Sequence, residues 1–207
     1  MLRTLLAGLL LLKSVHAPWA SCFEPSGRFT GPKTVRTPVM IAPDGQHRAY
    51  GELKASRNPG PTESCTLTAR LYVSKRPAAM RVLLTEPTFE DAGTGSSLAP
   101  IGWSRDSRWL AIERLDWTMD SGATTLLLYD SRSGKVSTPD VLGAVQRAMK
   151  KHCELGYRAV FGFDSQDRIR MRLADYEDDN GRETSCINGT ADWLYDLSSG
   201  QAHRVSK

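Results

Sequence analysis

The hydrophobic and polar residues of the chain alternate in short runs, and this pattern predicts strands over most of its length. Strand-like stretches run from His47 to Leu53, from Trp109 to Leu115 and from Ile169 to Leu173. A large apolar residue and a polar turn precede each stretch, and a loop rich in turn-forming residues follows it. The pattern therefore predicts an all-β protein made of repeated antiparallel strands.

The strands recur as three repeats with a period of about 60 residues. The repeats open at Ile41–Gly45, Trp103–Ser107 and Phe163–Asp167, and they close on short strands that contain Tyr72, Tyr129 and Tyr195. Each unit reads as strand, tight turn, strand, loop, strand, tight turn, strand, which is the four-stranded meander of one propeller blade. We expect three propeller-like four-stranded antiparallel blades at about 38–87, 99–138 and 159–206.

One segment, about 139–151, departs from the strand pattern and predicts a single inserted helix. Thr138 is a suitable N-cap residue, Pro139 suits the first turn, and Lys150 and Lys151 complement the negative end of a helix. Its apolar stripe is expected to pack on the adjacent sheet. The stripe consists of Val141, Leu142, Val145 and Met149.

The second opening carries a resemblance to a known family. Trp103–Ile112 reads WSRDSRWLAI and resembles the W-S-P-D-G-x-x-[IL]-A-[FY] signature of TolB-type propeller repeats. The first repeat supplies the Pro-Asp-Gly, at residues 43–45, and the third keeps only Phe163. The resemblance implies a propeller-like architecture whose partner is another envelope protein. Since known propellers use about four to eight blades, the chain is either an open stack or half of a six-bladed homodimeric ring.

The amino terminus resembles a secretory signal peptide, because Arg3 precedes the apolar run Leu5–Leu12. That run is too short to span a bilayer, and no later stretch is long enough. We expect cleavage after Ala20, which leaves a single β-repeat domain at 21–207 in the periplasm or secreted; lipidation of Cys22 is the alternative. The chain has 27 Lys and Arg against 23 Asp and Glu, scattered along its length, so nucleic-acid binding is not expected.

Four cysteines in an exported chain predict two disulfides. They are Cys22, Cys65, Cys153 and Cys186, and their spacing is not that of a zinc site. Three pairings are possible. The positions of the cysteines in the repeats favour Cys22 with Cys65 and Cys153 with Cys186. Pairing of Cys22 with Cys186 would instead join the first and last blades.

The sequence contains no catalytic motif and no phosphate-binding loop, so we expect neither catalysis nor a cofactor. The acidic segment 175–181 has the wrong register for a calcium loop, so no metal site is expected.

The residues expected to contact a partner form an aromatic and acidic rim at the same edge of two repeats. Asp116 stands beside Trp117, and Asp175 beside Tyr176. Alternatively, the aromatic rings cover the ends of their own strands. We therefore expect a non-enzymatic binding or scaffolding module for another envelope or secreted protein. The alternative is an exported hydrolase or hydrolase inhibitor that acts through a loop such as His152–Cys153 or the acidic segment.

Overall fold

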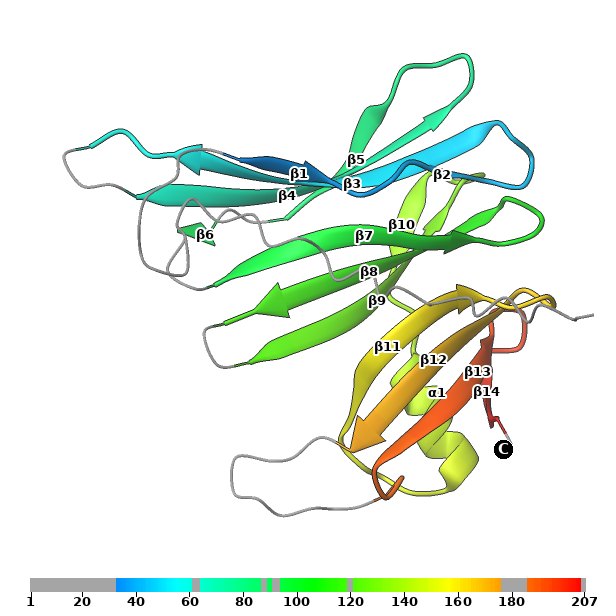
Figure 1. Cartoon of the computed structure of the whole chain (residues 1–207). Helices are drawn as coiled ribbons and strands as arrows, with labels where there is room; N and C mark the ends of the chain where they lie inside the picture. Colours follow the sequence, from blue (N-terminus) through cyan, green and yellow to red (C-terminus); the bar gives the residue numbers. More distant parts are fainter. Residues whose placement is uncertain are drawn as a thin grey trace, which may run out of the picture.

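The computed structural model describes residues 33–60, 64–86, 89–90, 94–118, 121–175 and 186–205. They form three antiparallel sheets, stacked one on the next, and one helix (Figure 1). The all-β prediction with three antiparallel sheets and one helix is confirmed. Within the described ranges the sheets form neither a closed barrel nor a closed ring of blades.

The second and third sheets are regular four-stranded meanders, whereas the first has six strands. The second sheet contains β7 (Gly95–Trp103), β8 (Trp109–Trp117), β9 (Gly122–Asp130) and β10 (Lys135–Ser137). The third contains β11 (Leu155–Phe163), β12 (Arg168–Asp175), β13 (Thr190–Asp196) and β14 (Gln201–Arg204). The first contains β1 (Thr34–Arg36), β2 (Met40–Ile41), β3 (His47–Arg57), β4 (Cys65–Lys75), β5 (Arg81–Thr85) and β6 (Phe89–Glu90).

The extra strands of the first sheet arise because β1 and β2 pair with different halves of β3. Pro38 interrupts the pairing between them, since proline has no amide hydrogen to give to a ladder. Thr37 bridges the gap: its amide donates to the Gly51 carbonyl, and its hydroxyl accepts from the Gly51 amide. β6 adds two residues beside β4.

The turns that join β2 to β3, β7 to β8 and β11 to β12 begin in the same way, and the third closes one residue earlier than the other two. In each, the first turn residue donates its amide to the carbonyl of the residue that opens the next strand; the pairs are Ala42 with His47, Ser104 with Trp109, and Asp164 with Arg168. The fourth turn residue always has a positive φ: 67° at Gly45, 59° at Ser107 and 59° at Asp167. The third repeat therefore makes a similar but shorter turn, although it keeps only Phe163 of the signature.

Side chains at this fourth turn position connect neighbouring sheets. Ser107 Oγ accepts the amide hydrogen of Asp44 at 2.9 Å, and Asp167 Oδ1 accepts that of Arg105 at 2.6 Å. The signature has glycine at this position, and glycine has no side chain to accept a hydrogen bond. Ser107 and Asp167 replace this glycine, and each accepts a hydrogen bond from the preceding sheet despite its left-handed backbone. We call this hydrogen bond the turn link.

The equivalence of the three closing tyrosines is wrong for the first repeat. β3, β8 and β12 begin their pairing with the next long strand at His47, Trp109 and Arg168. The partners of these residues are Lys75, Asp130 and Asp196, in the same order. Tyr129 and Tyr195 directly precede such partners, but Ser74 takes that place in the first sheet. Tyr72 instead lies two residues earlier and stacks on Tyr50, with ring centroids 4.7 Å apart.

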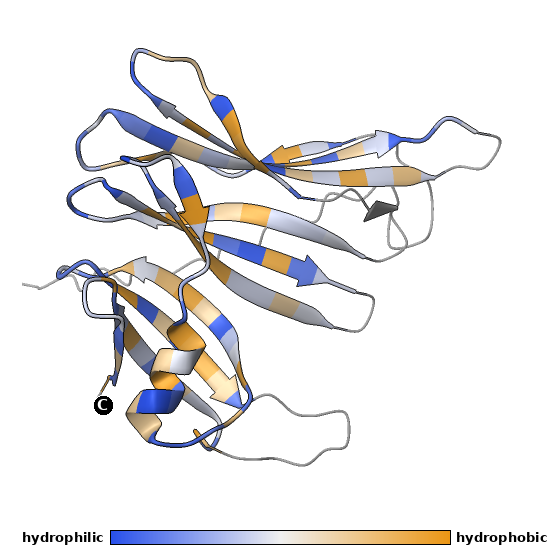
Figure 2. Ribbon diagram, turned by 180° about the vertical axis from the view of Figure 1, so that it is seen from behind, coloured by the Kyte–Doolittle hydropathy of each residue, from blue (hydrophilic) through white to orange (hydrophobic). Residues whose placement is uncertain are grey.

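The middle sheet is buried on both faces, whereas the outer sheets are buried on one. Leu110, Ile112, Leu127 and Tyr129 of the middle sheet belong to the core shared with the first sheet. Ala111, Leu126 and Leu128, on the opposite face, belong to the core shared with the third sheet and the helix. Figure 2 shows how hydrophobic and hydrophilic residues alternate along the strands, which is the pattern that gives each strand two different faces.

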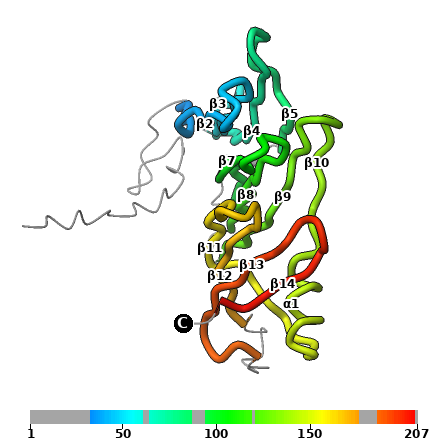
Figure 3. Tube along the Cα trace, turned by 90° about the vertical axis from the view of Figure 1, so that its right-hand side faces the viewer, coloured from blue at the N-terminus to red at the C-terminus, as the bar shows by residue number. Residues whose placement is uncertain are grey.

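The helix α1 (Val141–Met149) is shorter than the predicted 139–151. Its N-cap is Asp140 and not Thr138, because the Val141 amide first bonds the Pro139 carbonyl in a tight turn, and only the Ala144 amide reaches back to Asp140. The Asp140 side chain makes no cap and pairs with Arg147. α1 lies beside β14 (Figure 3), and Val141, Ala144 and Val145 are its buried residues.

Cys153 and Cys186 are joined by a disulfide, which confirms that predicted pair and excludes the pairing of Cys22 with Cys186. The bond ties the segment before β11 to the segment before β13. Cys65 is also disulfide-bonded. Cys22 and the expected signal peptide, residues 1–20, lie outside the described residues. In the described part of the chain, no helix is long and apolar enough to cross a membrane.

Candidate functional site

The predicted rim residues Asp116 and Trp117 line one pocket at the end of β8. This pocket has a volume of about 320 Å³ and also contains Gly95 and Ser96 from β7. The Trp117 ring lies over Gly95, where any side chain on residue 95 would collide with it. Glycine at this position thus makes room for Trp117, which packs against the core shared by the first and second sheets.

The carboxylates of the rim are engaged within the protein. Asp116 accepts hydrogen bonds from Ser96 Oγ at 2.5 Å and from Arg114 Nε at 2.9 Å. Asp175, at the end of β12, accepts from the amides of Cys186, Ile187 and Asn188. Asp175 therefore fixes the chain next to the disulfide. Tyr176 lies outside the described residues, so a paired aromatic rim stays a prediction.

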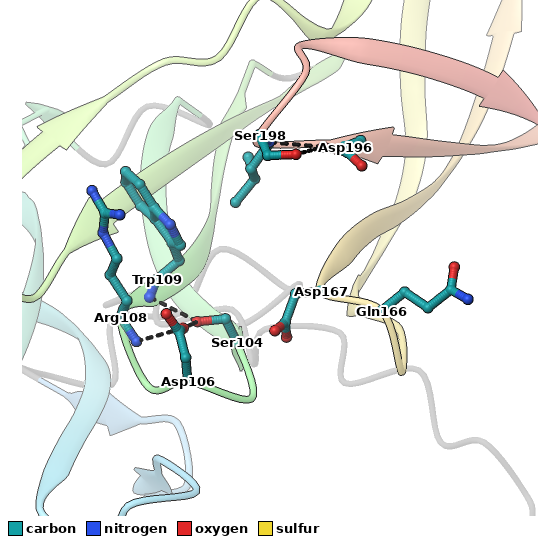
Figure 4. A pocket seen from close by; sticks show the side chains of 9 residues that line it. Ser104, Asp106, Arg108, Trp109, Gln166, Asp167, Asp196 and Ser198 are labelled. Atoms are coloured by element: carbon teal, nitrogen blue, oxygen red, sulfur yellow. Dashed lines mark hydrogen bonds between the residues drawn. The ribbon is translucent and has the colours of Figure 1, made fainter.

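A groove that the sequence analysis missed lies between the turns of the second and third sheets (Figure 4). Its volume is about 360 Å³, and the turn link from Arg105 to Asp167 lies at this junction. The lining residues are Ser104, Asp106, Arg108, Trp109, Gln166, Asp167, Asp196, Leu197 and Ser198. We call it the turn groove. The signature residues Ser104 and Asp106 were the available signal, but they do not show which turn lies opposite.

Local hydrogen bonds lower the pKa of two acids of the turn groove, Asp106 and Asp196. Burial alone would raise the pKa of Asp106, but hydrogen bonds from Ser104 Oγ and the Arg108 amide lower it. The Ser198 hydroxyl, followed by the Ser199 amide, lowers the pKa of Asp196 to about 2. Asp167, which accepts the Arg105 amide hydrogen, is the third acidic side chain that lines the groove.

Arg108 and Trp109 form one wall of the groove. The Arg108 guanidinium lies 4.7 Å from the centre of the Trp109 ring and pairs with Asp130 at 3.2 Å. This pairing, through a side-chain hydrogen bond, lowers the pKa of Asp130. Stacking on a planar ring and pairing with an acid both restrict the guanidinium, so this wall is held in place before any partner binds.

A smaller pocket of about 140 Å³ lies between the first and second sheets and contains His47, Trp103 and Tyr129. His47 Nδ1 is 2.6 Å from Asp44 Oδ2. Three hydroxyls line the same pocket: Ser74 Oγ accepts from Arg48, Tyr129 Oη accepts from Arg81, and Ser131 Oγ donates to the Ser107 carbonyl. None of the three is hydrogen-bonded to His47, so the pocket holds a histidine–aspartate pair without the nucleophile hydrogen bond of a catalytic triad.

The loop considered for hydrolase chemistry has no free thiol, because the Cys153 sulfur is bonded to Cys186. Across the residues that the structure describes, no group of three or more His, Cys, Asp or Glu side chains is placed to hold a metal ion. The acidic loop 177–181 lies outside the described residues.

No protein-family model matches the chain, and no curated protein matches its sequence. Function is therefore argued from the geometry of the described surfaces.

Proposed function

We propose that the protein is an exported, non-enzymatic binding module that holds a partner protein of the envelope or the extracellular space at the turn groove. The observation that carries this proposal is the groove itself, where Trp109 and Arg108 stand beside fixed carboxylates. Tryptophan and arginine are the residue types that most often dominate the energy of protein interfaces. The acids Asp106, Asp167 and Asp196 favour a partner segment with basic side chains.

The turn link supports the same proposal, because a binding surface needs a rigid base. Both sides of the groove are joined directly: the Arg105 amide donates to Asp167, and the Arg105 guanidinium donates to the Ser165 carbonyl at 2.7 Å. The two turns thus present their side chains as one unit, which reduces the ordering needed on association.

The proposal also includes the arrangement of the three sheets, which is an open stack of three propeller-like blades. The outer face of the first sheet carries four basic side chains, Arg36, Arg48, Lys54 and Arg70, against one acid, Glu52. The outer face of the third sheet carries Arg170 and Arg172 against Asp192. A two-copy ring would bring two basic faces together, which favours the open stack. Polar outer faces are also what terminal repeats of an open array require.

Export is part of the proposal, and the disulfide supports it. Disulfides persist in oxidising compartments such as the periplasm and the extracellular space. The described cysteines Cys65, Cys153 and Cys186 are all disulfide-bonded.

The test is site-specific photo-crosslinking in the native host with a photoreactive residue at Gln166, which lines the groove and takes no part in the core. We expect one dominant crosslinked partner, and we expect Asp106→Asn to reduce its yield several-fold. The matched control is Asp140→Asn, which removes the same charge from the helix. The proposal would be refuted if a normally folded protein forms no crosslink at residue 166. It would also be refuted if Asp106→Asn leaves the crosslink yield unchanged.

A further inference from the structure

The outer face of the third sheet is a separate surface from the turn groove. Along β12 the buried residues Ile169, Met171 and Leu173 face the core. Arg170 and Arg172 alternate with them and are exposed on the opposite face. α1 lies behind this sheet in Figure 1 and in front of it in the reverse view of Figure 2, so it covers the core side. No described element covers the arginine side.

The arginines of this face are fixed by one carboxylate. Arg170 Nη2 donates to Asp192 Oδ2 at 2.8 Å, and Arg172 Nε donates to Asp192 Oδ1 at 2.7 Å. The Asp192 side chain is only 16% exposed, whereas those of Arg170 and Arg172 are 50% and 46% exposed. A guanidinium has five N–H donors, so each arginine keeps donors for a second acceptor from solvent.

An exposed aromatic ring completes the cluster. Phe161 of β11 is 44% exposed, which is unusual for a large apolar side chain. The guanidinium carbons of Arg170 and Arg172 lie 5.3 and 5.5 Å from the centre of its ring. Phe161 therefore adds an apolar contact area directly beside the two positive charges.

A pocket of about 690 Å³ lies over this cluster and brings in a third arginine, Arg204, together with Thr190. Arg204 has no ion-pair partner in the described part of the chain. The Arg170 and Arg172 guanidinium groups meet one internal carboxylate, Asp192, and Arg172 and Arg170 hold the pKa of that carboxylate below its ordinary value. The surface keeps an excess of positive charge at any pH near neutrality.

The ligand chemistry follows from the geometry of the cluster. Planar guanidinium groups bind carboxylates through paired hydrogen bonds. Arg172 uses Nε and Nη2 on Asp192, whereas Arg170 uses only Nη2, so the other N–H groups of Arg170 can bind a ligand carboxylate. The apolar ring favours a ligand with an apolar side chain next to its acids. The small overall charge excess, 27 basic against 23 acidic residues, gives no broad field for a nucleic acid. We propose that this face binds an acidic peptide segment in which Asp or Glu residues flank apolar residues.

The test is fluorescence anisotropy with the purified disulfide-bonded protein and a labelled peptide of alternating Glu and Leu. The matched peptide carries Gln in place of Glu. We expect the acidic peptide to bind at least about tenfold more tightly than the Gln peptide, and its binding to weaken as salt rises. The double variant Arg170→Gln with Arg204→Gln should lose about tenfold in affinity. It keeps Arg172 on Asp192, so the carboxylate retains a partner.

The control is Lys54→Gln with Arg70→Gln, which removes the same two charges from the outer face of the first sheet. This variant should bind the acidic peptide as the wild type does. Equal loss in both variants, equal binding of the two peptides, or tighter binding of an oligonucleotide than of the acidic peptide would each overturn the inference. The assay needs no natural partner, so its outcome is independent of crosslinking at the turn groove.

Discussion

The middle sheet and the two outer sheets are built from the same repeat but occupy different environments. Leu110, Ala111 and Ile112 of the middle sheet are consecutive and fully buried, because one face meets the first sheet and the other the third. In the outer sheets, buried residues alternate with polar ones, as in β4 and β12. A strand shows period-two alternation only when one of its faces meets water.

This difference shows where the protein keeps its interaction surfaces. The middle sheet has no free face, so it presents only its turns and strand ends, including Trp109 at the turn groove. Among the described residues, nothing covers the outer faces of the first and third sheets, and these faces are rich in arginine. The basic cluster at Arg170 and Arg172 is therefore a feature of an end position in the stack.

The largest expected effect compares the same substitution in the two environments. Ile112 of the middle sheet is 0% exposed, and Ile41 of the first sheet is 54% exposed. Ile112→Ala should lower the free energy of unfolding by about 2 to 5 kcal/mol, through lost burial and the cavity that remains. Ile41→Ala should lower it by less than about 1 kcal/mol. Urea denaturation of both variants measures the difference; a similar loss in both would show that Ile41 is covered in solution.

The next effect concerns the turn link, which the middle turn makes to both neighbours. Ser107→Ala removes the acceptor of the Asp44 amide and keeps a side chain at φ 59°, so it should lower the free energy of unfolding by about 1 to 2 kcal/mol. Ser107→Gly also removes the acceptor but relieves the left-handed backbone. We therefore expect Ser107→Gly to destabilise less than Ser107→Ala.

Both variants can be measured by thermal and urea denaturation. If Ser107→Ala is neutral, the hydrogen bond between the first and second sheets does not contribute to stability. If Ser107→Gly destabilises more than Ser107→Ala, the serine backbone is not strained at this position.

The smallest expected effect is on the pH dependence of the free energy of unfolding. It concerns two carboxylates at equivalent positions, Asp130 and Asp196. Arg108 holds Asp130 in the middle sheet, whereas Ser198 and Ser199 hold Asp196 in the third. The pKa of Asp196 falls from 3.8 to about 2, so its contribution to stability is present above about pH 4 and is lost as pH falls toward about 2. In urea denaturation across this range, Asp196→Asn should lose less stability than the wild type. Parallel pH profiles would contradict this assignment.

The elements that depend on local pattern follow from the amino-acid sequence alone. Alternation of apolar and polar residues predicted the strands, and recurring turns at Gly45, Ser107 and Asp167 predicted three similar units. The repeats also gave the pairing of Cys153 with Cys186, because equivalent positions in a meander lie at equivalent edges. These features are local or follow from a repeat, so neighbouring residues suffice to specify them.

Tertiary structure decided the features that depend on which sheet faces which. The register placed Ser74, and not Tyr72, at the position of the first sheet that corresponds to Tyr129 and Tyr195. The Pro139 turn moved the N-cap of the helix from Thr138 to Asp140. Only the stacking of sheets brings Asp167 to Arg105 and forms the turn groove. No element in the described part of the chain covers the arginine face at Arg170. A repeat pattern does not show whether another sheet follows, so only the packing shows which faces remain in contact with water.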